Sequence, residues 1–272
     1  MQIVTFIAGL LILFVGLIIA VVWNQRRIMY PGWLLGGGDL KHQDVHVWND
    51  GGHHAALVSL PENKDAPVVV FFHGNGCTLS VVTNVMLPKF RLKYPNIGFC
   101  AIEYVGYGVL QDQGCPSFQS IVTGVKATMA LIHKKFDLDL YERGIFIGHS
   151  LGCSVAMQVL IDAGKGCKGL AFLAPFSSMH HVVVSKLPAP VGWIVSKCPF
   201  LVFDKIDNLA SARKLKDTPF PKIICGCRFD EIVPCEQSEL LAKEIGCELR
   251  LIDSNHTRVD ISDVYDWLDG IL

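Results

Sequence analysis

The fold is decided by residues 144–157, which read GIFIGHSLGCSVAM. The first four residues form an apolar, strand-like run, and the last four are typical of a helix. Between them stands Gly148-His149-Ser150-Leu151-Gly152. The spacing G-x-S-x-G between a strand and a helix predicts a sharp, strained turn that lifts the serine hydroxyl above a sheet, because only glycines leave room for the neighbouring strand and helix. Ser150 is therefore a candidate nucleophile.

A serine hydroxyl is a weak nucleophile unless a base and an orienting acid assist it. In chains with this turn the order is serine, acid, histidine. His256 follows the last strand-like run, 247–252, and Asp230 follows the run before it, 222–225. We expect both side chains at the carboxyl ends of neighbouring strands, above Ser150. His256 would take the serine proton, and Asp230 would orient and stabilise the imidazole.

Other carboxylates compete with Asp230 for the role of the acid: Glu231, Asp204, Asp207 and Asp253. Glu231 is the closest competitor because it follows Asp230 directly. Asp253 is too near His256 in sequence to come from a separate strand end. Asp204 and Asp207 lie further back, in the segment before the preceding helix.

Hydrolysis of an acyl group also needs two backbone N–H groups aimed at the developing oxyanion. Leu151, the residue after the nucleophile, is expected to supply one. The other should come from the loop after the strand-like run 68–72, which reads His73-Gly74-Asn75-Gly76. We assign it to the Asn75 N–H, with Gly76 as the alternative. The glycines allow the backbone to turn toward a substrate.

The remaining sequence alternates short apolar runs with longer amphipathic stretches. Most of the runs are continuously apolar, as in parallel strands that are covered on both faces. The alternation predicts one doubly wound, mostly parallel α/β sheet. The expected strands are 45–48, 55–60, 68–72, 98–104, 144–147, 170–173, 222–225 and 247–252, and the expected helices are 79–94, 118–135, 151–163, 236–245 and 259–268.

The N-terminus has the character of a membrane anchor. Residues 3–23 are almost wholly apolar, and as a helix they would span roughly 31 Å, about the thickness of a bilayer core. Trp23 suits the interface, and Arg26 and Arg27 follow it, which favours a cytosolic position for the rest of the chain. The alternative, a cleaved signal peptide, would need a basic start and a shorter apolar run. We expect an anchor at 1–27, a hinge at 36–38 and one catalytic domain at 28–272.

Composition excludes several other classes of protein. The formal net charge is −1, with 51% hydrophobic and 18% charged residues. A near-neutral surface gives no reason to bind nucleic acid, and so much apolar sequence is not that of a disordered chain. The ten cysteines are scattered, and the pairs His53-His54 and His180-His181 lack further ligands at metal spacing. We expect neither a metal nor another cofactor.

Five motifs together resemble the α/β-hydrolase superfamily, and more narrowly its membrane-anchored branch of bud-emergence-related and α/β-hydrolase-domain proteins. They are 71–76 (FFHGNG), 103–108 (EYVGYG), 148–152 (GHSLG), 230–234 (DEIVP) and 255–256 (NH). The resemblance implies an eight-stranded hydrolase sheet, a metal-independent Ser–Asp–His triad, and acyl esters or thioesters as substrates. Val105 stands where relatives usually carry a polar residue, so the substrate preference of those relatives does not transfer directly.

Residues 177–203 are rich in valine, aromatic residues and proline, and they lie where this fold accepts an inserted lid. One interpretation is a buried core helix. The other is an apolar lid, including Trp193, that covers an acyl pocket and faces the membrane. Trp193, Gly76 and Tyr107 are the candidate substrate-binding residues.

The sequence thus predicts a membrane-anchored serine hydrolase that acts on acyl lipids or acylated proteins. A narrower alternative is a thioesterase that removes palmitate from proteins. A different class is a membrane-tethered scaffold that keeps the fold without catalysis. The presence of the serine, the histidine and the elbow glycines favours the enzyme.

Overall fold

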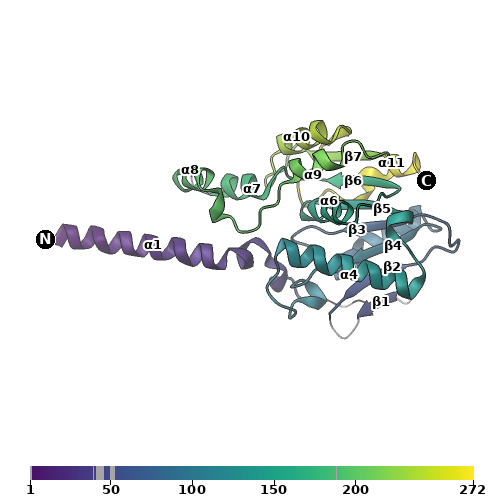
Figure 1. Ribbon diagram of the computed structural model, residues 1–272, viewed down its shortest axis with the longest axis horizontal. Coiled ribbons are helices and arrows are strands. Elements are labelled where there is room, and N and C mark those ends of the chain that lie inside the picture. The colour runs from purple at the N-terminus through teal and green to yellow at the C-terminus, as the bar shows by residue number, and fades with distance from the viewer. Residues whose placement is uncertain (1, 39, 41–45, 50–52, 188) are drawn as a thin grey trace.

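A computed structural model describes residues 2–38, 40, 46–49, 53–187 and 189–272 of the chain (Figure 1). Val45, the predicted start of the first strand, lies outside the described residues. The domain is built around one sheet, and a long helix, α1 (Gln2–Met29), projects from it.

The sheet has eight strands in the order β1-β2-β4-β3-β5-β6-β7-β8. β2 pairs antiparallel with β1 and β4, and every other pairing is parallel, which confirms the predicted mostly parallel sheet. The strands are β1 (His46–Asn49), β2 (Ala55–Ser59), β3 (Val68–Phe72), β4 (Gly98–Ile102), β5 (Gly144–His149), β6 (Gly169–Leu173), β7 (Lys222–Cys227) and β8 (Glu248–Ile252).

Each central strand is apolar throughout because its alternate residues enter two different cores. In β3, Val68, Val70 and Phe72 face one cluster, whereas Val69 and Phe71 face the other. The first cluster is covered by α4 (Phe118–Phe136), α6 (Leu151–Ala163), α9 (Asn208–Leu215) and α10 (Cys235–Ile245), together with the short α5 (Leu140–Arg143). The second is covered by α2 (Leu79–Val81), α3 (Leu87–Lys93) and α11 (Tyr265–Asp269).

Some predicted helices differ in detail from the observed ones. The expected helix 79–94 contains a π-helical turn, η2 (Val82–Met86), between α2 and α3, and the expected helix 259–268 is a 3-10 turn, η5 (Ile261–Val264), followed by α11. Short 3-10 turns also occur at η1 (Pro31–Leu34) and η3 (Gly108–Leu110).

The segment 177–203 forms α7 (Met179–Lys186), α8 (Ala189–Lys197) and the 3-10 turn η4 (Pro199–Leu201). It is not a buried core helix, because Trp193 is 66% exposed and Phe200 is 67% exposed. In Figure 1, α7 and α8 extend from the domain on the same side as α1.

The last turns of α1 are held against the domain. The Gln25 side chain donates to the Leu201 carbonyl at 3.0 Å and accepts from the Phe203 N–H at 2.8 Å. Arg26 lies 3.5 Å from the carboxylate of the buried Asp204. α1 therefore continues past the expected boundary at residue 27 and makes specific contacts with the domain near its end.

The predicted hinge at 36–38 lies partly against the domain. A Cβ on Gly38 would lie 2.2 Å from the Ser80 hydroxyl oxygen, and one on Gly37 would lie 3.6 Å from the Gly108 carbonyl. Gly38 therefore packs against the domain, whereas a Cβ on Gly36 would point into open space. Gly36 and Gly38 have φ values of 64° and 59°, which favour glycine. The hinge stays a prediction.

The turn between β5 and α6 depends on two close approaches. A Cβ on Gly152 would lie 1.9 Å from the Phe72 carbonyl oxygen, and one on Gly148 would lie 2.6 Å from the Cys153 backbone nitrogen. Both obstacles are backbone atoms and cannot swing aside. The start of α6 can therefore lie against the end of β3 only where residue 152 has no side chain.

We predict that Gly152→Ala destabilises the domain by about 3 kcal/mol, because the methyl group must push α6 away from β3. Thermal unfolding of the full-length protein in detergent would measure this as a drop of roughly 6–12 °C in the midpoint. Gly166→Ala is the matched control, because its Cβ would meet nothing closer than 3.7 Å. Equal midpoints for the two variants would contradict a packing role for Gly152.

Candidate active site

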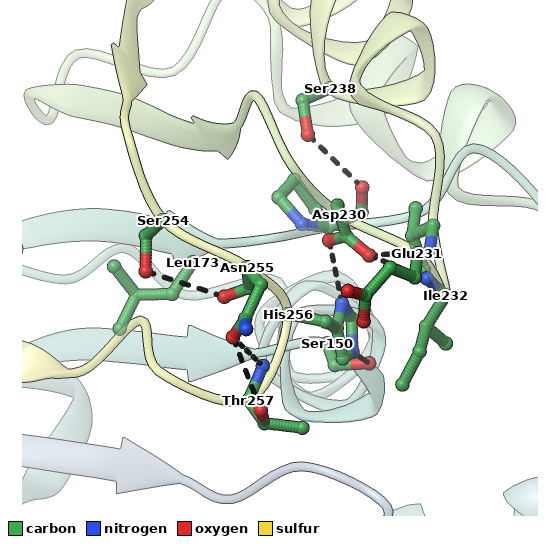
Figure 2. A network of polar contacts seen from close by, with 12 residues as sticks. Ser150, Leu173, Asp230, Glu231, Ile232, Ser238, Ser254, Asn255, His256 and Thr257 are labelled. Carbon is green, nitrogen blue, oxygen red and sulfur yellow. Dashed lines mark hydrogen bonds and ion pairs between the residues drawn. The ribbon is translucent and has the colours of Figure 1, made fainter.

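Ser150, His256 and Asp230 form one hydrogen-bonded chain, shown in Figure 2. His256 Nε2 lies 2.9 Å from Ser150 Oγ, and His256 Nδ1 lies 2.7 Å from Asp230 Oδ2. Ser150 follows β5, Asp230 follows β7 and His256 follows β8, so the three residues meet beyond the carboxyl ends of these parallel strands. This is where open α/β sheets place their ligands.

Asp230 is held as a carboxylate. Although burial would raise its pKa, the hydrogen bond from His256 and those from the Val233 and Ile232 N–H groups lower it below the ordinary value. Oδ1 accepts from these N–H groups at 2.7 and 2.9 Å, which leaves Oδ2 for the imidazole. An ionised acid at Nδ1 keeps a proton on that nitrogen and leaves Nε2 free to accept one from Ser150.

Three of the four competing acids have other partners, and the fourth points to solvent. Asp204 binds Arg26 and the Phe118 N–H, and Asp207 caps α9 through the Ala210 N–H. The Asp253 carboxylate is 77% exposed and lies 3.1 Å from Arg228. Glu231 is exposed, and within the described part of the chain its carboxylate accepts no hydrogen bond. The geometry therefore brings only Asp230, among the acids considered, to His256.

Ser150 has the strained backbone that the elbow requires, with φ 51° and ψ −112°. Few residues other than glycine adopt such a positive φ, and the surrounding structure must impose it. The Ser150 N–H donates to the Leu173 carbonyl at 2.9 Å, which ties the turn to β6. The serine directly precedes α6, whose N-terminal N–H groups and dipole favour negative charge beside the nucleophile.

His149 has a positioning contact that the sequence did not reveal. Its Nε2–H donates to the His256 carbonyl at 3.0 Å, since a carbonyl can only accept. Burial is the main cause that lowers the pKa of His149 to about 4, so the ring is neutral near pH 7. A Cβ on Gly74 would lie 2.7 Å from the His149 Nδ1 atom. His149 thus lies between the His256 loop and the loop after β3.

The loop after β3 passes beside His149, and the side chain of Asn75 binds groups outside the triad. Its Nδ2–H donates to the Met29 carbonyl at 2.6 Å, and its Oδ1 accepts from the Tyr107 hydroxyl. Within the described residues, neither the Asn75 N–H nor the Leu151 N–H has an acceptor in the protein. Gly76 is exposed, with open space where a Cβ would point.

Contacts among buried polar residues hold this loop in place. The His73 ring stacks on Tyr104 at 3.9 Å, and the Tyr104 hydroxyl donates to the His73 carbonyl at 2.9 Å. His73 Nε2 also lies 3.1 Å from Glu103 Oε1, although the two are not aligned as a hydrogen bond. Glu103 Oε2 accepts from the Leu79 N–H at 3.0 Å. Glu103 therefore anchors a loop.

One of the three candidate substrate-binding residues, Tyr107, has different surroundings from those expected. Tyr107 is 0% exposed and bonds to Asn75, so it supports the loop and does not present a surface to substrate. The sequence pattern could not distinguish a tyrosine that supports the loop from one that contacts substrate, because the residue type suits both. Trp193 lies exposed on α8, and among the described residues no hydrogen bond or ring contact joins it to Ser150.

Comparisons with known proteins agree with this geometry. The family model described as serine aminopeptidase, S33, matches residues 63–216, more than half of the chain. A search of curated proteins gives no match. Among solved structures, an α/β hydrolase from Vibrio vulnificus is similar with a TM-score of 0.67 and 15% identity, covering 91% of this chain and 92% of that one.

Two further structures have the same fold. An esterase from Pyrococcus furiosus has a TM-score of 0.56 and 17% identity, with 80% of this chain and 85% of that one covered. The 2-hydroxy-6-oxo-6-phenylhexa-2,4-dienoate hydrolase from a Rhodococcus species has a TM-score of 0.54 and 18% identity, with 79% and 92% covered. The family match, supported by the shared fold, shows that this chain belongs to the α/β hydrolases, in the family described as serine aminopeptidase, S33.

Proposed function

We propose that this protein is a membrane-anchored serine hydrolase that cleaves acyl esters or thioesters of lipids or acylated proteins. The observation that carries the proposal is the chain from Ser150 through His256 to Asp230, with contacts of 2.9 and 2.7 Å. A serine on a strained elbow, a histidine in reach of it and an ionised acid behind the histidine are the parts of an acyl-transfer site.

The reaction has two halves. Ser150 Oγ attacks the acyl carbon while His256 Nε2 takes the hydroxyl proton, and the carbonyl oxygen becomes an oxyanion. The Leu151 and Asn75 N–H groups are the donors we assign to it. When the intermediate collapses, His256 gives its proton to the leaving alcohol or thiol, and an acyl-Ser150 ester remains. Water, activated by His256, then releases the acid and restores the serine.

The proposed membrane location rests on α1 and on the exposed apolar residues near its end. Residues 5–29 have the length of a helix that could cross a membrane, and an 18-residue window within them has a mean hydropathy of 3.0. Trp193, Phe200 and Phe203 are exposed on the segment that Gln25 contacts. The proposed arrangement is a single pass through the membrane, with Arg26 and Arg27 on the cytosolic side and the catalytic domain beside them.

We predict that Ser150→Ala and His256→Ala each lower kcat about a million-fold, to background, because the base and the nucleophile act as a unit. Asp230→Asn should lower it about ten-thousand-fold, since a neutral amide no longer holds the correct tautomer. Initial rates on p-nitrophenyl butyrate and labelling by a fluorophosphonate probe would measure this. Glu231→Gln is the control and should keep wild-type activity.

The outcomes separate the alternatives. If wild-type protein shows no Ser150-dependent labelling or turnover, the scaffold interpretation replaces the enzyme. If Glu231→Gln is damaged and Asp230→Asn is not, the acid is assigned wrongly. Turnover of an amino-acid p-nitroanilide but of no acyl ester or thioester would contradict the proposed substrate class.

We predict that removing residues 1–22 spares hydrolysis of a soluble ester but lowers hydrolysis of an acyl substrate in vesicles at least about tenfold, because the anchor raises the local substrate concentration. This cut leaves Gln25 and Arg26, which contact the domain, in place. Rates of full-length and shortened protein on both substrates would test it. Equal loss on both would assign α1 a folding role, and no loss on either would contradict a membrane substrate.

A further inference from the structure

The side chain of Asn75 connects the candidate oxyanion loop to the end of the membrane helix. Its amide nitrogen lies 2.6 Å from the Met29 carbonyl, and its amide oxygen accepts from the Tyr107 hydroxyl. A backbone carbonyl can only accept, so the orientation of the amide is determined. Both polar ends of this half-buried side chain are therefore satisfied by groups from two other parts of the chain.

Met29 is the last residue of α1, where carbonyl groups have no partner within the helix. Asn75 supplies that partner. Tyr30, the next residue, is 0% exposed, and a Cβ on Gly32 would lie 2.5 Å from the Tyr107 ring. The chain that leaves α1 thus packs directly against the tyrosine that holds the other end of the amide.

The same end of α1 is fastened at two more points. Gln25 bonds to both the Leu201 carbonyl and the Phe203 N–H, and Arg26 pairs with Asp204. The position of the Met29 carbonyl is therefore fixed by several independent contacts between the end of α1 and the domain. Tyr107 is equally constrained, because its ring is fully buried and packs edge-on to His73 at 5.8 Å between centroids.

We propose that Asn75 is a positioning residue: its side chain, held between the Met29 carbonyl and the Tyr107 hydroxyl, sets the direction of the Asn75 N–H toward the oxyanion. The end of the membrane helix is thereby part of the support of the active site. This inference rests on the proposed serine hydrolase function. The contribution is electrostatic preorganisation, which needs the donor aligned before charge develops.

The test uses full-length protein in detergent and p-nitrophenyl butyrate. Asn75→Asp keeps the acceptor for Tyr107 but places an oxygen against the Met29 carbonyl, and Tyr107→Phe removes only the hydroxyl. We expect each to lower kcat about 10- to 100-fold with KM little changed, since removal of a whole oxyanion donor costs about 100- to 1,000-fold. Affinity for a boronic acid, whose oxygen occupies the same position, should fall by a similar factor.

Tyr94→Phe is the matched control. Tyr94 is also buried, at 7% exposure, and its hydroxyl bonds to the Tyr265 carbonyl and to Asp269 on the far side of the domain. Its loss should leave kcat unchanged. Asn75→Asp combined with Tyr107→Phe should cost much less than the product of the single losses, because both act on one network. The double variant Asn75→Asp, Tyr94→Phe should have the same kcat as Asn75→Asp alone.

The outcomes distinguish this inference from the proposed function. If wild-type turnover depends on Ser150 but Asn75→Asp keeps wild-type kcat per titrated active site, only the positioning role is overturned. The same conclusion follows if the variants lose thermal stability and active sites in parallel while kcat per site and boronic acid affinity stay unchanged. Absence of Ser150-dependent turnover in the wild type would overturn both.

Discussion

The structure depends on the close approach of α6 to the end of β3 at Gly152. A Cβ at this position would lie 1.9 Å from the Phe72 carbonyl oxygen, which leaves no room for any side chain. Because the helix must begin there, the chain from β5 has to reverse within one residue, and Ser150 takes the strain with φ 51°. That reversal puts the hydroxyl above the strand ends, where the loops after β7 and β8 deliver Asp230 and His256. The close packing of the α6 backbone against the β3 backbone thus places the Ser150 hydroxyl where a nucleophile is needed.

The end of α1 is in direct contact with the loop beside the candidate site. An apolar helix tethered by a flexible linker would leave the domain free to rotate. Here the end of α1 contacts the domain through Gln25, Arg26 and the Met29 carbonyl, and Gly32 and Gly38 after it pack against the domain. Such contacts fix the orientation of the domain relative to the helix axis. In the proposed membrane location, that orientation also sets which side of the domain faces the lipid.

The sequence predicted the parts of the molecule that local patterns encode. Strands buried on both faces leave continuous apolar runs, as in β3, and the elbow leaves a fixed glycine spacing around Ser150. Contacts between distant side chains and backbone leave no such pattern: nothing in the sequence links Asn75 to Met29, or Gln25 to Leu201. The sequence left Tyr107 open as a packing residue over the sheet edge or a pocket-lining residue, because the residue type alone does not tell which way a ring points; in the structure it is buried.

The central claim, that Ser150 forms an acyl-enzyme, is tested most directly by mass spectrometry. Full-length protein would be mixed with an activated acyl ester, quenched with acid during turnover, and digested. The account predicts a mass increase of one acyl group on the peptide that contains Ser150, lost again as substrate is consumed. Turnover without an adduct, or with the acyl group on a cysteine or another serine, would contradict it.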